Sequence, residues 1–450
     1  MAASLMTRFM PTNFRKSVEV NLLMAIARAT FLIMASRILT LLVGLFVAWF
    51  AAFSLSKMQQ GYLFTFLNLA AAQSLFELGI TGLILHHYSH AHALLLSAKS
   101  EIEIEQAKAV VVTARLYAFR YFLRAAVLFT GAVGVGGAVF FTLSENRSAI
   151  VWEPAWIIMV IATAIGLYNL RLYSYLEGFG QLKVSYMIRI KANVSLALFL
   201  FGFAYAFGGL SAYPAALLIS NLIASLFLWQ AQCHVDKEYQ LSGRYALNHF
   251  DIKREQRSIA LSTIAGYVAA NSLTPYTFYF FGAEIAGKVG FTMSIFSAIA
   301  ALAVARTTAE APSYGHLIVG KDFVALNHCY KQTSYFSLMF ATFLIFGVIA
   351  ARQVLERLIP EVAERMLGHS ELIVLGMLTL SSVLLAVTST ILRSFKTEPL
   401  TLPSLMAAVV CLVSQYIFMF KPFYCLVTLA VYNWVFFLPY SRFLLFRKIT

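Results

Sequence analysis

The stretch FLIMASRILTLLVGLFVAWFAAF, residues 31–53, decides the fold of this chain. It contains a single charged residue, Arg37. A helix rises about 1.5 Å per residue, so roughly 20 apolar residues cross a bilayer core about 30 Å thick. Because lipid offers no hydrogen-bond partners to the backbone, a lone apolar segment crosses it as a helix. The stretch is therefore predicted to span a membrane.

Similar apolar segments recur along the whole chain, which is 60% hydrophobic and 12% charged, with a mean hydropathy of +0.77. This composition excludes an ordinary soluble domain. The sequence predicts an all-α integral membrane protein with about 12 transmembrane helices. The other predicted spans are Gly61–Leu85, Tyr117–Leu143, Ala155–Tyr175, Ser185–Phe207, Tyr213–Ala231, Ile259–Phe281, Val289–Ala311, Tyr335–Ala351, Leu372–Leu392, Leu402–Phe420 and Phe423–Leu445.

Positive charges gather in alternate gaps between these spans. If the N-terminus is cytoplasmic, the gaps on the opposite side carry far fewer of them, namely Lys57, Arg147, Lys288, Arg352, Arg357, Arg365 and Lys421. Lysine and arginine accumulate on the cytoplasmic side of membrane proteins, so both termini are predicted to be cytoplasmic. The net charge of +14 is therefore explained mainly by the orientation of the chain in the membrane. A nucleic-acid partner is not expected, since no soluble module offers a basic face with interleaved aromatics.

The longest polar gap, 233–258, divides the predicted spans into six and six. We expect an N-terminal six-helix lobe at 1–232, a cytoplasmic linker at 233–258 and a C-terminal six-helix lobe at 259–450. A shift of 229 residues superimposes the two halves and indicates a parallel repeat with a pseudo-two-fold axis, the alternative being chance similarity between apolar helices. It places Gly61 on Gly290, Thr65 on Ser294, Ala71 on Ala300, Arg28 on Arg257 and His87 on His316.

Six motifs resemble those of polysaccharide flippases in the multidrug/oligosaccharidyl-lipid/polysaccharide (MOP) exporter superfamily. They are Gln60–Phe64, Phe76–Ile80, Leu176–Gln181, Gly282–Phe291, Ala311–Tyr314 and Lys321–Tyr330. The resemblance implies two pseudo-symmetric lobes around a central cavity that opens alternately to each side. It implies a transporter, with no enzymatic activity and no cofactor, that moves undecaprenyl-pyrophosphate-linked oligosaccharide units across the bacterial inner membrane. Membrane lipid, the lipid-linked oligosaccharide, and a polysaccharide polymerase with chain-length machinery are the implied partners.

Arg28, Arg37 and Arg306 are three of the positive charges within or next to predicted spans. An anionic, hydrated substrate head needs a wet, cationic passage. A charge inside the membrane costs a few kcal/mol or more unless it faces a cavity or a partner. We therefore expect these three arginines to line the substrate lumen. Alternatively, Arg28 and Arg37 extend their side chains to lipid phosphates at the membrane surface.

Two acidic residues are candidates for gating or ion coupling. The shift of 229 residues carries Glu77 onto Arg306, so these residues would face each other across the two-fold axis and close the cytoplasmic side. In the competing interpretation, Arg306 pairs with Glu310 one helical turn onward. Burial raises the pKa of a carboxylate, which would allow Glu77 or Glu310 to exchange H⁺ or bind Na⁺; the sequence does not choose between these ions.

Pro275 lies inside the seventh predicted span, where it removes a backbone hydrogen bond and is expected to kink the helix. His86 and His90 share one helical face, but no carboxylate lies in their cluster and histidines near lipid headgroups need no metal. We therefore predict no metal site.

Two rival functions compete with the flippase hypothesis. A multidrug or cation exporter of the same superfamily would favour an acidic lumen, whereas the intramembrane charges here are mainly positive. A membrane-embedded polysaccharide polymerase or glycosyltransferase would expose a long loop with catalytic groups, and the sequence contains no such constellation.

Overall fold

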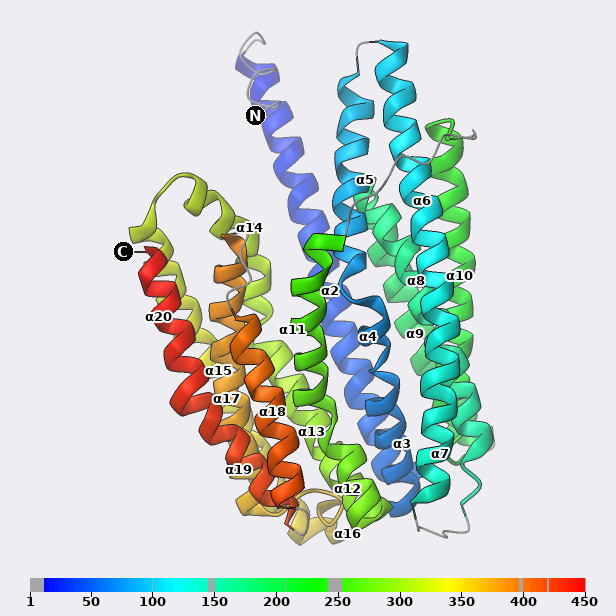
Figure 1. Cartoon of the computed structure of the whole chain (residues 1–450), viewed down its shortest axis with the longest axis vertical. Helices are drawn as coiled ribbons and strands as arrows, with labels where there is room; N and C mark the ends of the chain where they lie inside the picture. Colours follow the sequence, from blue (N-terminus) through cyan, green and yellow to red (C-terminus); the bar gives the residue numbers. More distant parts are fainter. Residues whose placement is uncertain are drawn as a thin grey trace.

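The computed structural model describes residues 12–98, 100–144, 150–206, 208–241, 253–395, 400–418 and 421–449, and all regular structure in these ranges is helical (Figure 1). We call the described residues up to 241 the N-terminal half. Its helices are α2 (Thr12–Ser54), α3 (Lys57–Ala70), α4 (Gln73–Glu77), α5 (Ile80–Ser97), α6 (Glu101–Phe129), η2 (Thr130–Gly134), α7 (Val135–Leu143), α8 (Glu153–Gly178), α9 (Leu182–Ala206) and α10 (Ala212–Glu238).

The described residues from 253 onward form the C-terminal half. Its helices are α11 (Lys253–Asn271), α12 (Leu273–Phe281), α13 (Ala283–Ala303), α14 (Ala305–Val319), α15 (Phe323–Leu358), α16 (Pro360–Ala363), α17 (His369–Ser394), α18 (Thr401–Ile417), α19 (Pro422–Tyr432), η3 (Asn433–Phe437) and α20 (Leu438–Ile449). In Figure 1, α2 begins and α20 ends toward the same end of the bundle, which we call the terminal end. The opposite end, where α16 lies, is the α16 end.

The described helices confirm the prediction of an all-α membrane protein. Nine are long and apolar enough to cross a bilayer, and the bent pair Lys57–Glu77 and Ile80–Ser97 makes a tenth crossing. The remaining two predicted spans correspond to the shorter apolar α18 and to α11 with α12, which are separated at Ser272. Large apolar side chains cover the outer face, as on α15, where Met339, Phe343 and Phe346 are exposed at helical spacing. Lipid is the solvent that makes such a surface stable.

Several passages are interrupted near their middle. Between α4 and α5, Leu78 and Gly79 both adopt positive φ angles, 50° and 73°, and the two parts of the passage meet at 46°. The equivalent passage of the C-terminal half breaks between α13 and α14 at Val304. These breaks place Glu77 and Arg306, the residues related by the shift of 229, beside an interruption in their respective passages.

The two halves pack against each other through α3 and α13, supported by α2, α4, α11 and α12. Glycines allow the close approach of α3 and α13. A Cβ atom on Gly61 would lie 1.8 Å from the Ala283 carbonyl oxygen, and one on Gly287 would lie 3.0 Å from the Gly61 nitrogen. Small residues let membrane helices approach closely enough for backbone packing, so this seam depends on glycine.

Candidate functional site

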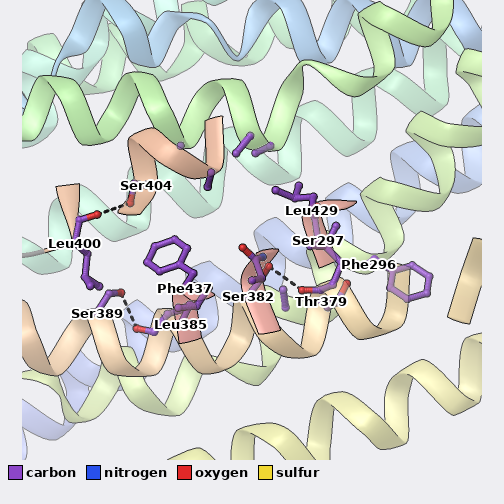
Figure 2. A pocket seen from close by; sticks show the side chains of 18 of the residues that line it. Phe296, Ser297, Thr379, Ser382, Leu385, Ser389, Leu400, Ser404, Leu429 and Phe437 are labelled. Atoms are coloured by element: carbon purple, nitrogen blue, oxygen red, sulfur yellow. Dashed lines mark hydrogen bonds between the residues drawn. The ribbon is translucent and has the colours of Figure 1, made fainter. Parts of the chain in front are cut away.

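A cavity of about 420 Å³ lies inside the C-terminal half (Figure 2). Helices α11, α13, α17 and α18 and the segment η3 form most of its wall. Small side chains leave this space open, among them Gly266, Ala270, Ala300, Ala386 and Ala407. The lining combines apolar groups with hydroxyl and amide groups, and the described lining residues include no carboxylate.

Four residues of the wall, Thr379, Ser382, Ser389 and Ser404, carry hydroxyl groups that donate to backbone carbonyls. Thr379 Oγ1 donates to the Leu375 carbonyl at 2.8 Å, and Ser404 Oγ donates to the Leu400 carbonyl at 2.8 Å. Ser382 makes the same kind of bond, and Figure 2 shows it on the cavity wall beside Thr379. Each hydroxyl oxygen keeps a lone pair that can accept a hydrogen bond. The wall therefore offers acceptors that suit a substrate rich in hydroxyl groups.

Arg393, in the last turn of α17, is the cationic side chain among the described lining residues. Arg393 is not among the predicted site residues, because the predicted span ends at Leu392 whereas α17 continues to Ser394. A positive residue at a span boundary is also the usual mark of membrane orientation, so the sequence contained no signal that would separate the two roles.

The structure pairs Arg306 with Glu310. Arg306 Nε donates to Glu310 Oε1 at 2.7 Å, and the other carboxylate oxygen accepts from Tyr314 at 3.0 Å and from Thr333 at 2.8 Å. This is the local alternative left open by the sequence. Neither Arg306 nor Arg37 is among the described residues that line the cavity.

The other predicted site residues are spread over the fold. Arg37 is exposed on α2, whereas the side chain of Arg28 lies outside the described residues. Glu77 ends α4 and is half-buried. Pro275 lies in the first turn of α12, just after the separation of α11 from α12. Their roles in the lumen, in gating or ion coupling, and in kinking the helix stay predictions. The described residues contain no cluster of three or more potential metal ligands.

A second polar group joins the halves at the α16 end, and we call its residues Lys57, Gln60, Glu364 and Arg365 the latch. Gln60 is only 1% exposed; its amide donates to the Gly287 carbonyl at 3.1 Å and accepts from Arg365 at 2.9 Å. Lys57 Nζ lies 2.5 Å from Glu364 Oε2. The latch thus ties α3 of one half to the loop after α16 of the other.

The described residues form twelve helical passages in two contacting halves, with a cavity in one of them, and this arrangement is similar to the fold of solved MOP superfamily transporters. No family model and no curated protein matches the sequence.

Three solved structures support this fold assignment. The inward-facing conformation of a multidrug resistance MATE family transporter of the MOP superfamily matches with a TM-score of 0.59 and 14% identity, over 91% of this chain and 98% of that one. The outward-facing conformation of such a transporter gives 0.58 and 14%, over 93% and 96%. The lipid II flippase MurJ in an inward closed conformation gives 0.56 and 12%, over 94% and 89%. The resemblance to the superfamily is confirmed at the level of fold, whereas membership of the polysaccharide flippase family stays a prediction.

Proposed function

We propose that this protein transports lipid-linked oligosaccharide units by alternating access across the bacterial inner membrane, with both termini in the cytoplasm. The observation that carries the proposal is the composition of the cavity wall: hydroxyl groups, one arginine and no carboxylate among its described residues. The fold shared with solved transporters supports it.

The cavity groups match the chemistry of an undecaprenyl-pyrophosphate-linked saccharide. Sugar hydroxyls donate hydrogen bonds, and the oxygens of Ser382 and Ser404 can accept them. The positive charge of Arg393 on the cavity wall would attract the negatively charged pyrophosphate. Arg37 would raise the positive potential along the route, and Arg28 would do the same at the terminal end. The charge of Arg306 is balanced by Glu310 in this structure, so Arg306 would contribute where that ion pair parts.

The latch gives alternating access a physical basis. In this proposal it closes the α16 end while substrate enters from the terminal end, and it parts when the lobes at 1–232 and 259–450 rock about the 233–258 linker. The carboxylate of Glu310, bonded to Arg306, Tyr314 and Thr333, is our candidate for coupling to H⁺ or Na⁺. Glu77 is the second candidate.

Export of organic cations is the second candidate function, because two of the matched structures are multidrug resistance MATE family transporters. A cationic substrate would gain most from a buried carboxylate, and the described cavity wall has none. Polymerase activity within the membrane is the third alternative.

One experiment separates these functions. The gene is deleted in its host and restored as wild type, as Arg393→Gln, or as Arg447→Gln, which removes an exposed arginine at the end of α20. Lipid-linked saccharides and surface polysaccharide are then analysed by mass spectrometry.

We expect the deletion to accumulate lipid-linked units and lose surface glycan, with rescue by wild type and Arg447→Gln but not by Arg393→Gln. Unchanged lipid-linked pools together with new sensitivity to organic cations would establish the exporter instead. Surface glycan reduced to single unpolymerised units would indicate the polymerase.

A further inference from the structure

A groove of about 500 Å³ lies between α9 and α10 at the terminal end, beside the turn that connects α8 to α9. Its wall combines basic and amide side chains with an apolar floor. The lining residues are Leu176, Gln181, Lys183, Val184, Met187, Ile188, Lys191, Phe227, Gln230, Ala231, His234 and Val235. None of these described residues is acidic.

The groove belongs to the lipid-facing side of α9. Helical periodicity puts Lys183, Met187 and Lys191 on one face, and all three are exposed. The same face continues toward the α16 end as exposed Val194 and Leu198. Charged residues therefore stand only at the terminal end of a face that is otherwise apolar.

The opposite face of α9 packs inside the protein. Its Ser185, Leu196 and Leu200 are buried. Arg189, near the same side, binds Glu177 of α8 at 2.9 Å. The groove consequently opens away from the interior of the N-terminal half and toward the surrounding bilayer.

The two lysines are set at different depths. Lys183 lies in the first turn of α9, and Lys191 lies about 12 Å further along the helix, at 1.5 Å per residue. The Lys191 ammonium is 4.1 Å from the centre of the Phe227 ring on α10, a cation–π contact that helps to hold a positive charge against an apolar surface. Gln230 and His234, one turn apart on α10, line the opposite wall of the groove.

We propose that this groove binds an anionic phospholipid. The phosphate of the headgroup lies between Lys183 and Lys191, Gln181 and Gln230 donate hydrogen bonds to it, and one acyl chain runs over Met187 along the Val194 and Leu198 face. Basic pockets between membrane helices bind anionic headgroups in this way. The inference is independent of the proposed function, because the groove lies outside both the cavity and the latch.

Native mass spectrometry of the full chain in detergent tests the proposal directly. Phosphatidylglycerol and phosphatidylcholine with identical acyl chains are added at equal concentration, and retained lipid is counted for the wild type, K183Q/K191Q and K321Q/K331Q. The last variant removes two exposed lysines at the same end of the C-terminal half, so it controls for net charge.

We expect the wild type and K321Q/K331Q to retain one phosphatidylglycerol about tenfold more strongly than phosphatidylcholine, a preference that two surface lysines can supply. K183Q/K191Q should lose this preference while keeping its melting temperature. Equal retention of both lipids by the wild type, or an unchanged preference in K183Q/K191Q, would overturn the proposal. So would binding of glycerol phosphate as tightly as phosphatidylglycerol, because the apolar floor would then contribute nothing.

Discussion

The two halves of the molecule share one architecture but fill it differently. Ten of the twelve largest fully buried side chains of the described residues lie in the N-terminal half, among them Tyr62, Phe66 and Trp156. The C-terminal half holds a cavity of about 420 Å³, whose wall combines glycine, alanine and serine with larger apolar side chains. The exceptions among the buried rings are Phe278, which packs onto the N-terminal core, and Tyr314.

The two halves therefore differ in how their interiors are packed. Phe66, Phe141 and Trp156 form a mutually packed group in the N-terminal half, with ring centres 5.1 to 5.5 Å apart. The C-terminal half is less tightly packed at its cavity, where hydroxyl and amide groups lie among apolar side chains. The glycine seam and the latch join the N-terminal half, with its buried aromatic rings, to the C-terminal half, which contains the cavity.

Removal of a large buried ring from the N-terminal half should have the largest effect on stability. Trp156→Ala removes a buried ring and the hydrogen bond from its Nε1 to the Gly134 carbonyl at 2.9 Å. We expect unfolding stability to fall by about 3–5 kcal/mol, the usual cost of such a truncation. Thermal melting in detergent measures it, with Trp229→Ala, a 61% exposed tryptophan on α10, as the control. Equal losses in both variants would show that the core is not tightly packed.

A Cβ atom added at Gly61, where α3 meets α13, should have the second-largest effect on stability. The Cβ of Gly61→Ala meets backbone atoms of Ala283, which cannot rotate aside, so we expect a cost of about 1–3 kcal/mol and separation of the halves at the α16 end. Spin labels at Ser54 and Glu361, in a background without the four native cysteines, report the separation by electron-electron distance measurement. Gly82→Ala, with nothing within 4 Å of the added atom, should leave the distance unchanged.

A large side chain placed in the cavity of the C-terminal half should change transport more than stability. Ala386→Phe places a ring in the cavity, so we expect stability to change by less than about 1.5 kcal/mol while transport falls tenfold or more. Lipid-linked saccharide accumulation in the complemented deletion host measures the loss. Ala350→Phe, on an exposed position of α15, is the matched control, and wild-type transport by Ala386→Phe would exclude this cavity from the substrate route.

The sequence predicted the fold better than the site, for a physical reason. Hydropathy reveals each crossing because every span must present an apolar surface to lipid. Among the described residues, ten of the twelve predicted spans correspond to passages long and apolar enough to cross a bilayer, one of them as a bent pair. The other two correspond to the shorter α18 and to α11 with α12, which are separated at Ser272. The Arg306 pair was one of two stated alternatives, since residues at i, i+4 on a helix are neighbours.

The cavity and the latch could not be predicted in this way. Ala300 and Ala386 read as ordinary apolar helix residues, because a cavity is defined by the volume that neighbouring helices fail to fill. Gln60 and Arg365 bond across 305 positions of the chain, and Arg365 looked like one of the few charges of a non-cytoplasmic loop. Long-range polar contacts leave no local pattern in a single sequence.

The smallest expected effect concerns the exposed ion pair of the latch and its dependence on pH. The hydrogen bond from Lys57 holds the pKa of Glu364 below its ordinary value of 4.5, whereas Lys57 stays protonated throughout the acidic range. The pair therefore contributes its full stabilisation above pH 4.5 and loses it as the pH falls through the lowered pKa.

We accordingly expect the Ser54 to Glu361 label distance to broaden only slightly between neutral pH and the lowest pH at which the protein stays folded. Glu364→Gln, which cannot ionise, should be broadened already at neutral pH and respond less to acid. Glu356→Gln, which alters an exposed carboxylate on α15 outside the latch, should behave as the wild type. If Glu364→Gln shows the wild-type label distance at neutral pH, the ion pair does not hold the α16 end closed. The closure then rests on the buried bonds of Gln60 and on the glycine seam, so the two halves are joined there by packing and not by charge.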